Sequence, residues 1–282
     1  RAEGFEHIVD CYGVRSEMYY IPQPSQVPER LHHTRWIGDR SLEFLAGRDR
    51  SRPFFLWTSF TKPHPPFESP VPWNRLYKPV EMPMPFLPPG WEDLLTFWNR
   101  LQNRYKYRDQ GLDWNLIRLM RAQYYACISF VDHNVGRILG HLREEGALNN
   151  TLVLFTSDHG ELLGDYGSFG KRSIWDSAAR VPLVARYPEA FAPGEVCDEP
   201  ASLVDVLPTC LAVAGLSHGP EHAGMDLGGL AAGDCERDGI LCQYQDGGAG
   251  LYGLITREWK YVYSVADGKE WLLRRLPGRL DE

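Results

Sequence analysis

The sequence lacks several features that would assign it to a simple class of protein. No apolar run approaches the length of about 18 residues that a membrane-spanning helix needs, which excludes a transmembrane segment. No block of Lys or Arg stands out, and 30 basic against 37 acidic residues give a formal net charge of −7. Nucleic acid and anionic membranes are therefore unfavourable partners. None of the six Cys forms a C-x-x-C pair, which argues against a structural zinc site.

The chain also lacks an ordinary start. It begins at Arg1, its first methionine is Met18, and residues 1–10 have no apolar core of a secretion signal. We therefore expect a processed chain or a piece of a longer protein, which leaves open whether that protein is cytoplasmic or exported. The composition, 43% hydrophobic and 24% charged, is typical of a globular chain and excludes a mostly disordered one.

Hydrophobic periodicity predicts helices and strands that alternate over most of the chain. Apolar residues recur at helical spacing in three segments: 33–47, 115–145 and 202–214. Compact apolar runs, typical of strands buried on both faces, are found at 53–60 and 151–156, with a third strand candidate at 181–186. Short strands divided by Gly-rich or charged turns follow at 240–244, 251–256 and 260–264.

This order of elements predicts an α/β protein. We expect a mostly parallel sheet flanked by helices over 1–216, followed by a small antiparallel C-terminal subdomain over 217–282. The boundary falls in 217–238, which is rich in Gly and turn residues. The oligomeric state does not follow from the sequence.

Polar side chains follow two of the predicted strands. Lys62 and His64 come after 53–60, and Asp158 and His159 come after 151–156. The Gly-rich stretch that follows permits a tight path, which could bring Lys171 back over the strand end. Open α/β sheets place ligands beyond the carboxyl ends of their strands, so these residues are the candidates for a functional site.

Each candidate has a functional and a structural interpretation. Asp158 and His159 offer an oxygen and a nitrogen ligand for a divalent cation, or they cap a turn and pack nearby. His64, held between two prolines, could bind an oxyanion or give a proton to a leaving group, or it is a surface-loop histidine. Lys171 could neutralise a tetrahedral anion, or it is a solvated lysine.

The segment 68–114 is rich in aromatic residues, including Trp73, Trp91 and Trp98. It predicts a long ordered surface stretch, and long loops are often functional. Aromatic faces there could stack on a sugar or an aryl group, or they could fill a small core of their own.

Two stretches carry a resemblance to a known family. Residues 156–182, TSDHGELLGDYGSFGKRSIWDSAARVP, closely resemble the second half of sulfatases, and residues 60–67, FTKPHPPF, look like their central histidine loop. The segments NTLVLF, DVLPT and WKY also fit in order, so the resemblance covers nearly the whole chain. Sulfatases belong to one superfamily with alkaline phosphatases and phosphonate hydrolases, which implies an alkaline-phosphatase-like fold.

The resemblance implies roles position by position. Asp158 and His159 would be ligands of a divalent cation, usually Ca²⁺ or Mg²⁺ and possibly Mn²⁺. Lys171 would bind a sulfate oxygen and the bridging oxygen, and His64 would contact the sulfate and assist the leaving group. Lys62 is a further substrate-binding candidate, which would act through a neighbouring residue of the site. Many sulfatases have Asn where His159 stands; His is more typical of the branch with phosphonate monoester hydrolases and choline-sulfatase-like enzymes.

One family motif is not found in this sequence. Sulfatases carry C-x-P-x-R or S-x-P-x-R, whose Cys or Ser becomes the formylglycine nucleophile, and an early Asp pair that supplies further metal ligands. The nearest stretches, 11–15 and 168–172, both have Gly where Pro belongs. We therefore expect formylglycine only in a missing N-terminal part, and we expect the chain alone to be inactive.

Three functions follow as hypotheses. The first is metal-dependent hydrolysis of a small-molecule or carbohydrate sulfate ester. The second is hydrolysis of a phosphonate monoester or a phosphodiester on the same scaffold, which His159 favours. The third is a non-catalytic protein that binds a sulfated ligand, which rests on the missing nucleophile motif alone.

Overall fold

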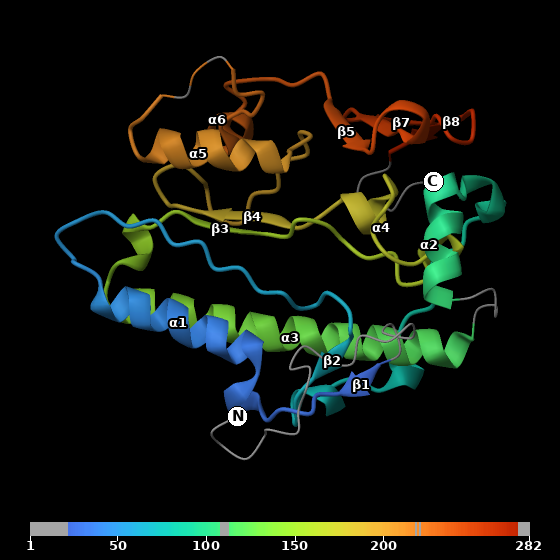
Figure 1. The fold of residues 1–282 in the computed structure, drawn as a ribbon. Helices are drawn as coiled ribbons and strands as arrows, with labels where there is room; N and C mark the ends of the chain where they lie inside the picture. Colours follow the sequence, from blue (N-terminus) through green and yellow to red (C-terminus); the bar gives the residue numbers. More distant parts are fainter. Residues whose placement is uncertain (1–21, 108–112, 218, 220, 276–282) are drawn as a thin grey trace. The chain divides into compact units, whose positions relative to one another are not determined.

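The computed structural model describes residues 22–107, 113–217, 219 and 221–275, and it consists of two compact units (Figure 1). The first unit comprises Arg1–Pro85 and Arg104–Leu148, and the second comprises Phe86–Asn103 and Asn149–Glu282. The predicted boundary between 216 and 217 stays a prediction.

The described elements are mostly short, apart from two helices that the sequence predicted. The helices are α1 His33–Gly47, α2 Phe97–Tyr107, α3 Trp114–Glu144, α4 Asp176–Ala179, α5 Val206–Val213 and α6 Leu227–Ala232. The strands are β1 Gln23–Pro24, β2 Glu68–Ser69, β3 Val153–Thr156, β4 Leu183–Arg186, β5 Ile240–Tyr244, β6 Leu251–Ile255, β7 Trp259–Ser264 and β8 Lys269–Arg274. Single 3-10 turns are η1 Glu29–Leu31, η2 Trp73–Arg75, η3 Pro79–Glu81, η4 Trp91–Leu94, η5 Leu148–Asn150, η6 Asp165–Gly167, η7 Leu203–Asp205 and η8 Gly247–Ala249.

The first unit is built on the pairing of α1 with α3, which lie side by side in Figure 1. His32 caps α1, because its Nδ1 accepts a hydrogen bond of 3.1 Å from the backbone N–H of Thr34. The helices approach closely at Gly38, where an added Cβ would lie 2.5 Å from Oδ1 of Asn134. No helix among the described residues is long and apolar enough to cross a membrane.

Residues 53–60 do not form the predicted strand buried on both faces. Within the described chain they pair with no other strand, and Phe55 and Trp57 are 70% and 69% exposed. The alternate residues face α1: Thr58 Oγ1 lies 3.0 Å from Ser41 Oγ, and the ring of Phe54 contacts Phe44. A strand is buried on both faces only where layers cover both, and here α1 covers one face.

The second unit contains two separate antiparallel sheets. β3 pairs with β4, and β5 to β8 form a four-stranded meander in chain order. The predicted C-terminal antiparallel sheet is therefore confirmed. The mostly parallel sheet is not confirmed, because the described residues form only small sheets and β1 with β2 is the parallel pair among them.

The core of the second unit joins the meander to the stretch after β3. Tyr166 and Trp175 are fully buried together with Leu251 of β6 and Val262 of β7. Lys260 of β7 is buried as well: its ammonium donates to Asp176 and, at 3.1 Å, to the carbonyl of Ile174. This packing fixes the residues that follow β3, which include three of the predicted site residues.

Candidate metal and anion site

The second unit brings Asp158, His159 and Lys171 together just beyond the end of β3. Lys171 Nζ lies 2.6 Å from Nε2 of His159, and Oδ2 of Asp158 lies 3.5 Å from the same nitrogen. Asp158 is 84% exposed and His159 is 23% exposed at the side chain. A carboxylate, an imidazole and an ammonium group therefore converge at one place, as the sequence predicted for this strand end.

The protonation of His159 is set by its own backbone neighbour. Nδ1 lies 2.7 Å from the carbonyl oxygen of Gly160, which only accepts, so Nδ1 carries the proton. In the neutral ring Nε2 then holds a lone pair, and it accepts from the ammonium of Lys171. Metal-ligating histidines commonly donate their other ring N–H to a backbone carbonyl in this way.

Left-handed backbone turns carry the chain from His159 back to Lys171. Gly164, Gly167 and Gly170 have φ of +93°, +60° and +86°, which glycine adopts readily. Leu163 and Tyr166 are also left-handed, at +44° and +53°, where a side chain costs free energy. Such strain persists only where surrounding packing enforces it, and Tyr166 is fully buried.

Asp158 and His159 fit the donor set of a divalent cation. A carboxylate oxygen suits hard cations, and the lone pair on Nε2 of His159 adds a nitrogen ligand. Lys171 beside them supplies a positive charge that suits an anionic group on a ligand. Two ligands from this chain leave most coordination positions to other groups.

The predicted residues Lys62 and His64 belong to the first unit. His64 is half-buried, and its Nδ1 lies 2.8 Å from the carbonyl oxygen of Pro65, so Nδ1 carries a proton. Lys62 is buried, and its ammonium lies 2.6 Å from the carbonyl of Pro66 and 3.1 Å from Glu68 Oε1. These contacts tie Lys62 to the loop that carries His64; contact of Lys62 with substrate stays a prediction.

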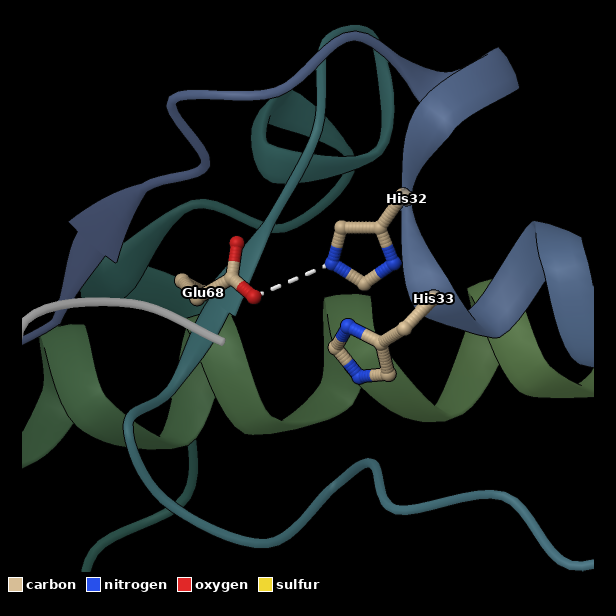
Figure 2. Close-up of side chains that lie close together, drawn as sticks. All are labelled: His32, His33 and Glu68. Atoms are coloured by element: carbon tan, nitrogen blue, oxygen red, sulfur yellow. Dashed lines mark hydrogen bonds and ion pairs between the residues drawn. The ribbon is translucent and has the colours of Figure 1, made fainter. Parts of the chain in front are cut away.

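A second group of potential metal ligands lies in the first unit, as Figure 2 shows. Ligand atoms of His32, His33 and Glu68 lie within 4.8 Å of one another, and His32 Nε2 is 3.0 Å from Glu68 Oε1. Sequence reasoning missed this group, because nothing in the spacing of residues 32, 33 and 68 links them.

The hydrogen bonds of this group favour a structural role over metal binding. Nδ1 of His32 accepts from the backbone N–H of Thr34, so the proton of the neutral ring sits on Nε2 and points at Glu68. A metal on Nε2 would have to displace that proton and the cap of α1 with it. His32 thus has the opposite tautomer to His159.

The charges in this group shift two pKa values downward. Burial, with the nearby His32 and Lys62, lowers the pKa of His33 from 6.5 to about 3. Burial alone would raise the pKa of Glu68, but the hydrogen bond from His32 and the charge of Lys62 hold it at about 2. At neutral pH His33 is therefore neutral and Glu68 is ionised.

Solved structures similar to this chain show its fold. A phosphonate monoester hydrolase of Agrobacterium radiobacter aligns with a TM-score of 0.80 and 25% identity over 97% of this chain and 60% of its own. The phosphonate monoester hydrolase SpPMH of Silicibacter pomeroyi aligns with a TM-score of 0.78 and 24% identity, over 95% and 61%. These neighbours define the class of protein by its fold, which is alkaline-phosphatase-like.

Sequence comparison identifies the family within that class. The family model described as sulfatase matches residues 1–216, and the model described as N-sulphoglucosamine sulphohydrolase, C-terminal, matches residues 164–277. The chain belongs to the sulfatase family.

Individual relatives agree with this assignment. The arylsulfatase of Clostridium perfringens is 33% identical over 89% of this chain and 53% of its own length. The choline-sulfatase of Rhizobium meliloti is 32% identical over 78% and 44%. The multifunctional alkaline phosphatase superfamily protein PehA of Trinickia caryophylli is 32% identical over 67% and 39%. The chain spans about half the length of the curated relatives it matches.

The lowered pKa of His33 predicts an acid-sensitive first unit. His33 has a pKa of 6.5 in the unfolded chain and of about 3 in the folded chain. The neutral ring therefore contributes its full share to the free energy of unfolding above pH 6.5. This contribution is lost as the pH falls from 6.5 towards 3, because the unfolded chain then binds a proton that the folded chain does not. Between pH 6.5 and pH 3, the free energy of unfolding should therefore decrease less steeply with falling pH in His33→Gln than in the original protein, by up to about 1.4 kcal/mol per pH unit. Urea unfolding at a series of pH values measures this; parallel curves for the two proteins would contradict it.

Proposed function

We propose that the protein containing this chain hydrolyses a sulfate monoester with the help of a divalent cation. The observation that carries this proposal is the convergence of Asp158, His159 and Lys171 beyond β3. Asp158 and His159 offer ligands for a cation, and Lys171 offers a positive charge for an anion. A site that recognises a sulfate group needs both. Membership in the sulfatase family supports the same reaction.

Asp158 and His159 are the proposed cation ligands, through a carboxylate oxygen and through Nε2. The resemblance favours Ca²⁺ or Mg²⁺, with Mn²⁺ as a further candidate. When bound, such a cation offsets negative charge that develops on the reacting group. Gly160 contributes through its carbonyl, because the hydrogen bond from Nδ1 holds the ring of His159 in the tautomer that a ligand needs.

Lys171 and His64 are the proposed groups that act on the ester. Lys171 provides a positive charge for the sulfuryl and bridging oxygens, and its side chain already donates to an acceptor beside it. A doubly protonated His64 would give its Nε2 proton to the departing alcohol oxygen and become the neutral ring, whose remaining proton on Nδ1 bonds to the carbonyl of Pro65. Lys62 holds the His64 loop through Pro66 and Glu68.

The nucleophile is the part of the reaction that this sequence does not supply. Neither C-x-P-x-R nor S-x-P-x-R occurs in its 282 residues. We propose that the chain alone binds the cation and the sulfate group but shows no turnover, because a covalent pathway requires its nucleophile.

The substrate class rests on the relatives. A choline-sulfatase and an N-acetylglucosamine-6-O-sulfatase of Bacteroides thetaiotaomicron, 26% identical, are among them, so a small-molecule or carbohydrate sulfate ester is the proposed substrate. Aromatic residues of 68–114 supply no argument for a sugar platform: Trp73 stacks on Phe130 and Trp98 packs on Tyr244.

A phosphonate monoester or phosphodiester is the second candidate substrate. Histidine at position 159 favours it, because the resemblance associates His rather than Asn at this position with phosphonate monoester hydrolases. The multifunctional relative PehA supports the same alternative.

Removal of a proposed ligand is expected to weaken cation binding by the chain itself. Asp158→Asn replaces a charged ligand by a neutral amide, so the affinity for Ca²⁺ or Mn²⁺ should fall at least about tenfold. His32→Gln is the matched control, because its amide can still donate to Glu68. Isothermal titration measures both. Binding that survives Asp158→Asn and disappears in His32→Gln would place the cation in the first unit.

Loss of the Lys171 charge is expected to reduce turnover by the full-length protein. Lys171→Ala should lower kcat/KM for 4-nitrophenyl sulfate by about 100- to 1,000-fold, the usual loss when one group that stabilises transition-state charge is removed. Lys269→Ala, at an exposed lysine of β8, should have no effect. Equal activity of the two variants would refute the role of Lys171.

The same assay distinguishes the three hypotheses. A higher kcat/KM for 4-nitrophenyl phenylphosphonate than for the sulfate would favour the second candidate. Hydrolysis of neither substrate with cation present, together with cation-dependent binding of a sulfated sugar, would establish a non-catalytic protein.

A further inference from the structure

Two consecutive amide side chains on α2 hold the backbone of the stretch that carries Lys171. Gln102 is 3% exposed and Asn103 is half-buried, and both belong to the second unit with residues 167–172. Neither residue has a role in the resemblance or in the proposed chemistry.

Gln102 contacts this stretch on both sides of Gly170. Its Nε2 donates to the carbonyl oxygen of Phe169 at 2.6 Å, and its Oε1 accepts from the backbone N–H groups of Lys171 at 3.4 Å and Arg172 at 3.3 Å. A primary amide has the same donor and acceptor as a peptide group. Gln102 therefore pairs with this backbone as a neighbouring strand would.

Asn103 extends the same pairing toward the start of the stretch. Its Nδ2 donates to the carbonyl oxygen of Gly167 at 3.0 Å, and its Oδ1 accepts from the N–H of Phe169 at 3.3 Å. Glu161 acts from a different element, because its Oε1 accepts from the N–H of Gly170. The backbone N–H groups from Phe169 to Arg172 thus all donate to side chains, whereas those of Gly167 and Ser168 donate to backbone carbonyls.

The packing at Gly170 shows how closely Gln102 sits on this backbone. A Cβ at Gly170 would lie 2.3 Å from Nε2 of Gln102, and φ of +86° there already favours glycine. The next residue is Lys171, whose own N–H bonds to Gln102 while its ammonium meets His159. Gln102 therefore bonds to the backbone of the same residue, Lys171, whose side chain carries the ammonium group to His159.

We propose that Gln102, assisted by Asn103, is a positioning residue that sets the place of the Lys171 ammonium relative to His159. This rests on the proposed function of Lys171. Without the Gln102 amide, the carbonyl of Phe169 and the N–H groups of Lys171 and Arg172 would lose these hydrogen bonds, and the lysine stem would sample positions away from the sulfate-binding place. Misplacement of a charged group by about 1 Å is enough to cost up to about 100-fold in rate.

The test compares Gln102→Ala and the isosteric Gln102→Glu with Gln123→Ala. Gln123, on α3, also donates one amide hydrogen bond to a backbone carbonyl, that of Asn74 at 3.0 Å, and serves as the matched control. Hydrogen exchange of the chain should show the amides of Lys171 and Arg172 exchanging at least about tenfold faster in Gln102→Ala. Gln102→Glu keeps the acceptor for both but loses the donor to Phe169, and should lie between.

Kinetics of the full-length protein supply the second readout. Gln102→Ala should lower kcat for 4-nitrophenyl sulfate by about 10- to 100-fold. Cation affinity should change no more than in Gln123→Ala, and Gln102→Glu should recover part of the loss in kcat. If Gln102→Ala matches Gln123→Ala in exchange and in kcat while Lys171→Ala is impaired, the positioning role is wrong and the proposed function stands. If Lys171→Ala itself is fully active, the function assigned to Lys171 fails, and with it the positioning role.

Discussion

The hydrogen bond from Nδ1 of His159 to the carbonyl of Gly160 is the interaction on which the site depends. It joins neighbouring residues, so the backbone after β3 determines the tautomer without help from a distant element. With the proton on Nδ1, Nε2 presents a lone pair toward Asp158 and Lys171. Were the proton on Nε2, that nitrogen could neither accept from Lys171 nor ligate a cation beside Asp158.

His32 and His159 each lie beside a carboxylate, but their hydrogen bonds give them different tautomers. His32 lies beside a carboxylate and a second imidazole, yet its Nδ1 accepts from the N-terminus of α1, which assigns the Nε2 proton to Glu68. Its role is to connect α1 to β2 and, through Glu68 and Lys62, to the loop that bears His64. A buried chain of hydrogen bonds of this kind holds a loop more rigidly than packing of proline rings alone.

The proximity of Asp158, His159 and Lys171 could be predicted from the sequence because local features determine it, whereas their roles stay a prediction. The apolar run 151–156 is followed by Asp158 and His159, and Gly164, Gly167 and Gly170 permit the left-handed turns that return Lys171. Sheet order was less predictable, since residues 53–60 and β4 have apolar runs that suit several partners. The hydrophobic pattern of a segment indicates how far a strand is buried, but it does not indicate which strand lies beside it or whether the two are parallel. Gln102 left no signal, because an amide on a helix face is as often solvated as bound.

Histidine side-chain ¹⁵N spectra of the chain test the central claim most directly. The account predicts that the neutral ring of His159 is protonated on Nδ1 and that of His32 on Nε2, two states with distinct nitrogen shifts in the same sample. Addition of Ca²⁺ should then move the Nε2 resonance of His159 and leave that of His32 in place. A His159 ring protonated on Nε2, or a cation response at His32 instead, would contradict the account.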